Sequence, residues 1–115
     1  MKPVSGDLQT FKTEFFRALA HPVRIRILEV LVRGERTVGE IQQELGLEQS
    51  LVSQQLSILR SKNIVAARKD GTTVRYTVRD PLLGELLNVA RQIFDNHLVG
   101  TQSLLRALRR ERRHG

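Results

Sequence analysis

The chain has 115 residues and a mass of 13.1 kDa, which is enough for one domain with one modest hydrophobic core. It contains no cysteine, which excludes disulfides, thiolate nucleophiles and every metal site built on sulfur. A net charge of +7 favours a polyanionic partner, and no segment approaches the roughly 20 apolar residues that cross a bilayer. We therefore expect a cytoplasmic protein without a membrane partner.

The basic residues are concentrated in two blocks. Residues 60–79 hold six Lys and Arg against one acidic residue, and residues 105–115 hold five against one, whereas residues 35–59 are acidic. Neither block carries the bulky aromatic residues of an amphipathic membrane helix, so a nucleic acid is the favoured partner. For either block alone, a solvated charged surface is the alternative.

Two helices are predicted in the first third of the chain. Residues 8–19 place Leu and Phe at helical spacing behind Asp7, which is a good N-cap residue. In the next segment, apolar residues alternate with arginine as in a strand, but Pro22 suits the first position of a helix and Gly34 suits the C′ position. We interpret this segment as a helix, with His21 as its N-cap.

Two short helices follow, joined by a glycine-containing turn. Thr37 and Glu40 have the spacing of a capping box, so a helix should begin at Val38 and stop at Gly46. The next helix should run from about Gln49 to Ser61. This pair is a helix-turn-helix.

The remaining segments predict a β-hairpin and a long last helix. Apolar residues alternate up to Val78, and Asp70-Gly71 is a strong signal for a two-residue hairpin turn. From Leu82 the spacing becomes helical, with an apolar stripe about seven turns long in which Gly100 favours a bend or an interruption. Residues 109–115 form a basic tail that is predicted to fray.

The predicted helix over residues 49–61 has an uncharged polar face opposite an apolar one. Val52, Leu56 and Leu59 share the apolar side. Gln and Ser side chains hydrogen-bond to base edges, and the second helix of a helix-turn-helix enters the major groove. The candidate base contacts are Gln49, Ser50, Ser53, Gln54 and Ser57. The alternative is that these are ordinary surface residues.

Basic side chains next to this helix are candidates for phosphate contacts. They lie at the end of the helix and on the hairpin, where they would fix the protein's position on the duplex while Gln and Ser discriminate sequence. These residues are Arg60, Lys62, Arg68, Lys69 and Arg75.

Three segments resemble the ArsR/SmtB family of winged helix-turn-helix transcriptional regulators: "FRALAHPVRIRILEVL", "TVGEIQQELGLEQSLVSQQLSILRSKNIV" and "ARKDGTTVRYTV". The resemblance covers residues 8 to about 95. It implies a mainly α fold with a small β-hairpin, the wing, over Lys69 to Arg75 and including Thr72. Its base-reading positions fall on the same Gln and Ser residues. Many members carry His at one or both positions matching Gln54 and Gln55, and we assign Gln55, which lies toward the apolar side, a supporting role.

The resemblance also implies a homodimer that binds an inverted-repeat operator in double-stranded DNA. The first and last helices would hold the dimer, so residues 1–108 would form one winged helix-turn-helix domain with a dimerisation helix at each end. The candidate interface residues are Phe11, Phe15, Leu83, Leu87, Ala90 and Phe94.

The metal sites of the family do not transfer to this chain. The thiolate type of site needs cysteine, which this chain lacks. In the other type, on the last helix, the matching positions are occupied by Asp80, Leu82, Ile93 and Asn96, and only Asp80 is a residue that the family carries there. The remaining candidates for a nickel, zinc or cobalt site with nitrogen and oxygen ligands are Asp95, His97 and His114.

The sequence therefore predicts a sequence-specific DNA-binding regulator, with repression favoured over activation. The alternative is a winged-helix interaction module whose DNA binding or sensing depends on a second regulatory protein. An enzyme is disfavoured, because the chain has none of the motifs G-x-x-x-x-G-K-[ST], G-x-G-x-x-G, G-x-S-x-G or H-E-x-x-H.

Overall fold

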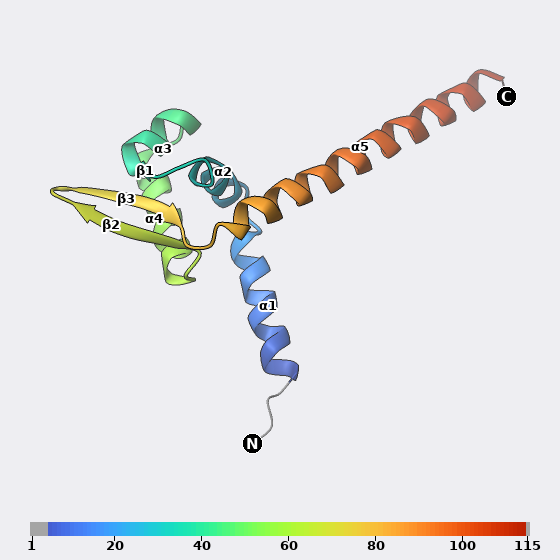
Figure 1. Cartoon of the computed structure of the whole chain (residues 1–115). Helices are drawn as coiled ribbons and strands as arrows, with labels where there is room; N and C mark the ends of the chain where they lie inside the picture. Colours follow the sequence, from blue (N-terminus) through green and yellow to red (C-terminus); the bar gives the residue numbers. More distant parts are fainter. Residues whose placement is uncertain (1–4, 115) are drawn as a thin grey trace. The chain divides into compact units, whose positions relative to one another are not determined.

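The computed structural model describes residues 5–114, without the side chains of Ser5, Arg113 and His114. The chain divides into two units, one ending at Pro81 and the other beginning at Leu82. The first unit contains seven elements in chain order (Figure 1): α1 (Ser5–Leu19), α2 (Pro22–Leu31), β1 (Arg36–Thr37), α3 (Val38–Leu45), α4 (Gln49–Ser61), β2 (Val65–Asp70) and β3 (Thr73–Val78). The second unit is the helix α5 (Leu82–His114).

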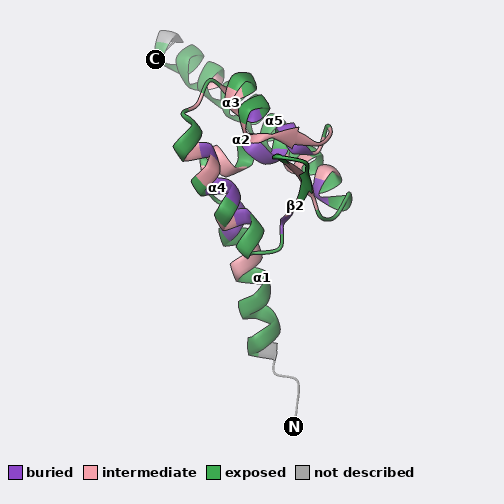
Figure 2. Ribbon diagram, turned by 90° about the vertical axis from the view of Figure 1, so that its left-hand side faces the viewer, coloured by how far each residue is buried: buried purple, intermediate pink, exposed green. Residues whose placement is uncertain are grey.

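The core of the first unit is aliphatic. Helices α2, α3 and α4 pack against one another, and β2 packs beside α4. In Figure 2 the buried residues of these elements are coloured purple. The largest side chains with almost no exposed surface are Ile27, Leu28, Ile41, Val52, Leu56, Leu59 and Val65. Each such side chain stabilises the fold by about 1.5–3 kcal/mol relative to an exposed one.

The ends of α3 and α4 follow local sequence signals. Thr37 and Glu40 form the predicted capping box, with Glu40 N donating to Thr37 Oγ1 (3.1 Å) and Thr37 N donating to Glu40 Oε1 (2.9 Å). Gly46 ends α3 in the left-handed conformation at φ 65°. Asn63 (φ 60°) ends α4, and the amides of Asn63 and Ile64 donate to Arg60 O and Leu59 O in a Schellman motif.

The first two helices differ slightly from their predicted bounds. Helix α1 begins at Ser5, so Asp7 lies within its first turn, where its charge favours the helix dipole, rather than at the N-cap. Helix α2 ends at Leu31, before the predicted stop at Gly34. His21 is the N-cap of α2, as predicted, and its Nδ1 accepts a hydrogen bond from Val23 N at 3.2 Å.

A three-stranded antiparallel sheet in the order β1-β3-β2 replaces the predicted two-stranded hairpin. The sequence analysis missed β1 because two residues are too short to show alternation; they pair with β3 as Arg36↔Tyr76 and Thr37↔Arg75. The hairpin register pairs Asp70 with Thr73, so the central turn residues are Gly71 and Thr72, one position later than predicted. Gly71 supplies the positive φ (66°) that this turn requires.

Helix α5 is continuous over 33 residues, or about 50 Å. Gly100 does not interrupt it. The backbone of residues 109–114 is also helical where fraying was predicted, because Arg, Leu, Ala and Glu are all strong helix formers and extend the preceding helix. Within residues 5–114, no helix has the length and apolar character needed to cross a membrane.

Candidate nucleic-acid interface

The orientation of α4 is fixed by its buried side. Val52, Leu56 and Leu59 have no exposed surface, so the opposite side of the helix faces solvent. The structure therefore exposes four of the five side chains predicted to read bases, and it leaves Ser53 half-buried. The exposed residues are Gln49, Ser50, Gln54 and Ser57.

Gln55 is the exception among the polar residues of α4. It is only 6% exposed, as its position toward the apolar side indicated. Its Oε1 accepts a hydrogen bond from Arg24 Nε at 2.8 Å, and Arg24 Nη1 donates in turn to Ala18 O at 3.1 Å. Gln55 is therefore held inside the protein and is not placed to contact a base.

The N-terminus of α4 leaves a carboxylate close to the proposed reading face. Glu48 is the N-cap residue, it is exposed, and its side chain makes no capping hydrogen bond. The free amides of the first turn and the positive end of the helix dipole also point toward the N-terminal end of α4, where Glu48 lies. The carboxylate of Glu48 suits that dipole and would repel a nearby phosphate.

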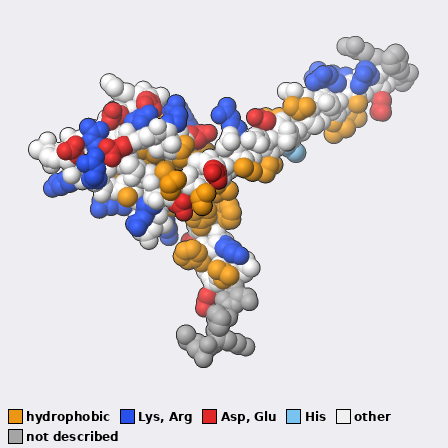
Figure 3. Space-filling view, in the orientation of Figure 1, with side chains coloured by type: hydrophobic (Ala, Val, Ile, Leu, Met, Phe, Trp, Pro, Cys, Tyr) orange, Lys and Arg blue, Asp and Glu red, His pale blue; other side chains and the backbone are white. Residues whose placement is uncertain are grey.

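The basic residues predicted to bind phosphate lie on the surface of the first unit, where Figure 3 shows Lys and Arg interspersed with acidic side chains. Lys62 lies 3.9 Å from Glu14 on α1. Arg60 and Lys69 are exposed and form no ion pair with any residue that the structure describes. Thr72 is exposed at the tip of the hairpin.

Two further predicted phosphate contacts, Arg68 and Arg75, are also paired with carboxylates. Arg68 Nη2 donates to Glu35 Oε1 at 2.8 Å, and the same oxygen lies 3.8 Å from Arg75 Nε. Arg75 is also 3.8 Å from Glu40 and 3.4 Å from Asp70. Glu35 was missed by the sequence analysis because it lies in a short loop far along the chain from both arginines.

Comparison with known proteins places this geometry in a family. The family described as "Bacterial regulatory protein, arsR family" matches residues 21–67. An uncharacterized HTH-type transcriptional regulator of Mycobacterium tuberculosis, Rv0081, is 47% identical over 106 residues, which cover 91% of this chain and 93% of that protein. The chain belongs to the ArsR family. The resemblance found in the sequence is thereby confirmed, and the chain is a DNA-binding transcriptional regulator rather than an enzyme.

Solved structures and a further relative resemble this chain as well. The crystal structure of Rv0081 matches with a TM-score of 0.75 at 46% identity, covering 88% of this chain and 98% of that one. A homodimeric winged helix-turn-helix domain from Mycobacterium bovis, Mb0332, has a TM-score of 0.76 at 28% identity, covering 85% and 91%. A probable mercury resistance operon repressor of Streptomyces lividans is 46% identical over 67% of this chain and 62% of that protein.

The interface residues predicted for this ArsR-family chain differ in their exposure. Phe11 and Phe94 are exposed at 74% and 64%. Phe15, Leu87 and Ala90 are half-buried, and the Phe15 ring packs edge-to-face on Phe16 with centroids 5.4 Å apart. Leu83 is only 6% exposed in the single chain.

The three candidate metal ligands lie on α5. Asp95 and His97 are two positions apart on α5 and so point about 200° apart around the helix axis. His114 ends α5, and its side chain lies outside the described part of the structure. Among the side chains that are described, no three His, Cys, Asp or Glu residues are close enough to hold a metal ion.

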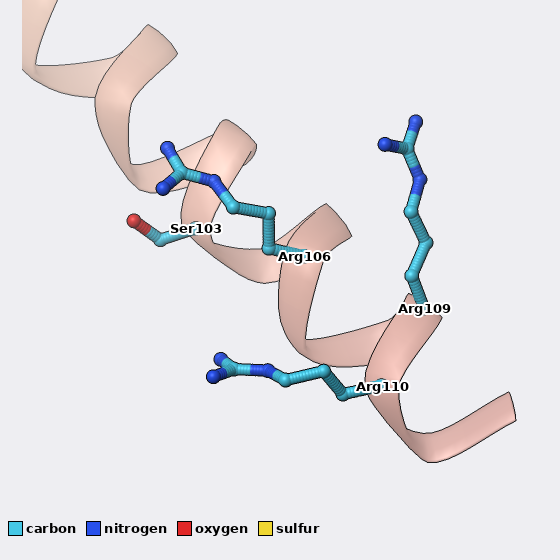
Figure 4. A pocket seen from close by; sticks show the side chains of 4 residues that line it. All are labelled: Ser103, Arg106, Arg109 and Arg110. Atoms are coloured by element: carbon cyan, nitrogen blue, oxygen red, sulfur yellow. The ribbon is translucent and has the colours of Figure 1, made fainter. Parts of the chain in front are cut away.

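The C-terminal part of α5 carries a group of arginines. Figure 4 shows Arg106 and Arg110 extending toward the side on which Ser103 lies, with Arg109 extending apart from them. On a helical wheel these residues lie opposite Leu104 and Leu108. Up to Arg110, α5 therefore has one basic side and one apolar side, whereas Arg112 lies four residues after Leu108, on the apolar side.

Proposed function

We propose that this ArsR-family protein is a cytoplasmic, homodimeric repressor that reads an inverted-repeat operator with α4. The observation that carries the proposal is the exposed row of uncharged polar side chains on α4, held outward by the buried residues on its other side. Gln and Ser discriminate bases by hydrogen bonding, and each good bidentate contact contributes about 1–3 kcal/mol. In this proposal, the recognition of bases by α4 does not require nickel, zinc or cobalt.

Phosphate contacts would come from residues around α4. Arg60 and Lys69 are the best candidates, because neither is paired with a carboxylate among the described residues. Arg68, Arg75 and Lys62 would exchange their present carboxylate partners for phosphates, with Thr72 at the tip of the wing. Such contacts fix the position of the protein on the duplex and make its affinity depend on salt.

The proposed dimer rests on apolar surface that a single chain leaves exposed. On α1, Phe11 and Phe16 are 74% and 58% exposed. On α5, a continuous apolar stripe is exposed; its members include Leu86, Ile93, Phe94, Leu98, Leu104, Leu105 and Leu108. Monomers rarely leave so large an apolar surface uncovered. The homodimeric state of Mb0332 supports the same assembly.

Pairing through these helices sets the distance between the two copies of α4. Two recognition helices read half-sites about one DNA turn, or 34–36 Å, apart. Ala90→Glu should therefore give monomers that bind the operator weakly, as measured by sedimentation and fluorescence anisotropy. Asn88→Glu, which adds the same charge on the opposite side of α5, is the control and should remain dimeric. A dimeric Ala90→Glu variant with full affinity would contradict this assembly.

The arginines at the end of α5 would add attraction to DNA that does not depend on sequence. Deleting residues 109–115 removes Arg109 and Arg110 together with the rest of the basic end. The slope of log affinity against log salt should then become shallower, since fewer counterions are released on binding. An unchanged slope would mean that these arginines are simply solvated, with their charges favouring the C-terminal end of the helix dipole.

The central experiment is a fluorescence-anisotropy titration of the protein onto a labelled duplex from upstream of its own gene, with a scrambled duplex as the control. Preference for the upstream duplex at physiological salt would support a regulator that binds DNA alone. Equal binding to both would favour an interaction module that needs a second regulatory protein. Repeating the titration with nickel, zinc and cobalt tests the metal alternative, in which His97 would bind with carboxylates of the second subunit.

A further inference from the structure

Arg24 connects the first helix to the recognition helix. It lies in the first turn of α2 and is half-buried. Its guanidinium donates from Nη1 to Ala18 O in the last turn of α1 (3.1 Å) and from Nε to Gln55 Oε1 in the middle of α4 (2.8 Å). One side chain therefore holds two helices that lie far apart in the sequence.

Both partners of Arg24 are buried, so neither hydrogen bond is readily replaced by water. Ala18 is 3% exposed, and Gln55 is the one buried polar residue among those that the structure describes. The carbonyl of Ala18 is among the last four of α1, which have no partner within their own helix. Loss of either bond would leave a buried polar atom without its partner, and hydrogen bonds from a charged donor are stronger than neutral ones.

A second contact between α1 and the end of α4 is much weaker. Lys62 lies 3.9 Å from Glu14, and both side chains are 44–48% exposed. Exposed pairs of this kind contribute little, because water and salt screen them. The Arg24 hydrogen bonds are thus the stronger polar link between α1 and α4.

We propose that Arg24 is a positioning residue that couples the placement of α1 to the orientation of α4, so that sequence reading depends on how α1 is held. This inference rests on the proposed function, in which α1 belongs to the dimer interface and α4 enters the major groove. Gln54 is the neighbour of Gln55 on α4. A rotation of α4 that follows Gln55 therefore moves Gln54 with it.

The first test compares two substitutions of Gln55. Gln55→Met removes the acceptor at similar size, whereas Gln55→Glu keeps an oxygen that accepts from Arg24. We expect Gln55→Met to lower the ratio of operator to scrambled-duplex affinity about tenfold, with scrambled-duplex affinity unchanged, and Gln55→Glu to retain most of the ratio. If Gln55→Met lowered the melting temperature but left the ratio of operator to scrambled-duplex affinity unchanged, the Arg24 hydrogen bonds would be purely structural and the proposal would be overturned.

The second test measures the coupling itself on a duplex with a single half-site, where DNA cannot bridge two subunits. Phe11→Glu disrupts the exposed face of α1 and should weaken half-site binding about fivefold when Gln55 is present. In the Gln55→Met background, Phe11→Glu should cause little further loss of half-site affinity. If the double variant instead lost half-site affinity by the sum of the two single effects in free energy, the proposed coupling between α1 and α4 would be overturned. A wild-type protein with no operator preference would instead overturn the proposed function.

Discussion

Glu35 holds Arg68 through a hydrogen bond of 2.8 Å between Arg68 Nη2 and Glu35 Oε1. The same carboxylate oxygen is 3.8 Å from Arg75, so Arg68 on β2 and Arg75 on β3 share one acidic partner in the loop before β1. In the proposed complex these arginines face DNA phosphates. Glu35 then competes with the phosphates for them.

Removal of this competitor should strengthen DNA binding. Glu35→Gln frees the charge of Arg68 and part of that of Arg75. We therefore expect the affinity for any duplex to rise about two- to fivefold, which corresponds to the free energy of one exposed ion pair. Anisotropy titrations at several salt concentrations would measure it. Glu29→Gln removes the same charge from an exposed position on α2. An equal gain from Glu29→Gln would attribute the effect to net charge rather than to the wing.

Base reading predicts a different signature from phosphate binding. Gln54→Ala should weaken operator binding about tenfold through the loss of base contacts and leave the salt dependence unchanged, because no counterion contact is removed. Competition titrations with operator and scrambled duplexes would measure both quantities. Gln92→Ala, at an exposed glutamine of α5, is the matched control. Equal losses on the two duplexes would remove Gln54 from the set of base contacts.

The capping box of α3 predicts a dependence of stability on pH. The hydrogen bonds from Thr37, its backbone amide foremost, lower the pKa of Glu40 below its ordinary value of 4.5. A lowered carboxyl pKa stabilises the fold above about pH 4.5, and this stabilisation is lost as the pH falls through the folded-state pKa. Glu40→Gln should therefore flatten the fall in melting temperature below that pH, as followed by circular dichroism. An unchanged pH profile would contradict the prediction.

Two glycines predict opposite effects of the same substitution. Gly46 ends α3 at φ 65°, where a side chain strains the backbone, so Gly46→Ala should lower the free energy of unfolding by about 1 kcal/mol although a Cβ there meets no atom within 4 Å. Gly100 lies within α5, and Gly100→Ala should favour that helix by about 1 kcal/mol. Chemical denaturation and helix content measure the two effects. A neutral Gly46→Ala would show that the end of α3 can relax.

The features that the sequence predicted well are those that depend on near neighbours. The capping box at Thr37, the N-cap at His21 and the bounds of α4 each follow from a few consecutive residues. The outward face of α4 followed from helical periodicity. These signals act before any tertiary contact forms.

The features that were missed depend on residues far apart in the chain. Strand β1 exists only because β3 pairs with it, and Glu35 gains its role only when the wing folds beside it. The partner of Gln55 could not be inferred either, since Arg24 lies 31 positions earlier. The last residues of α5 have no apolar anchor, but their strong helix propensity continues the preceding helix.

The pairing of Thr37 with Arg75 leaves no linker between the wing and the helix-turn-helix. Thr37 is at once the last residue of β1 and the N-cap of α3, so the sheet continues directly into the first helix of the pair. In the proposed complex, the wing and the helix-turn-helix would therefore meet a duplex as one connected unit. We expect such a unit to select the groove width of base pairs that no side chain touches, since DNA that must deform to fit binds less tightly.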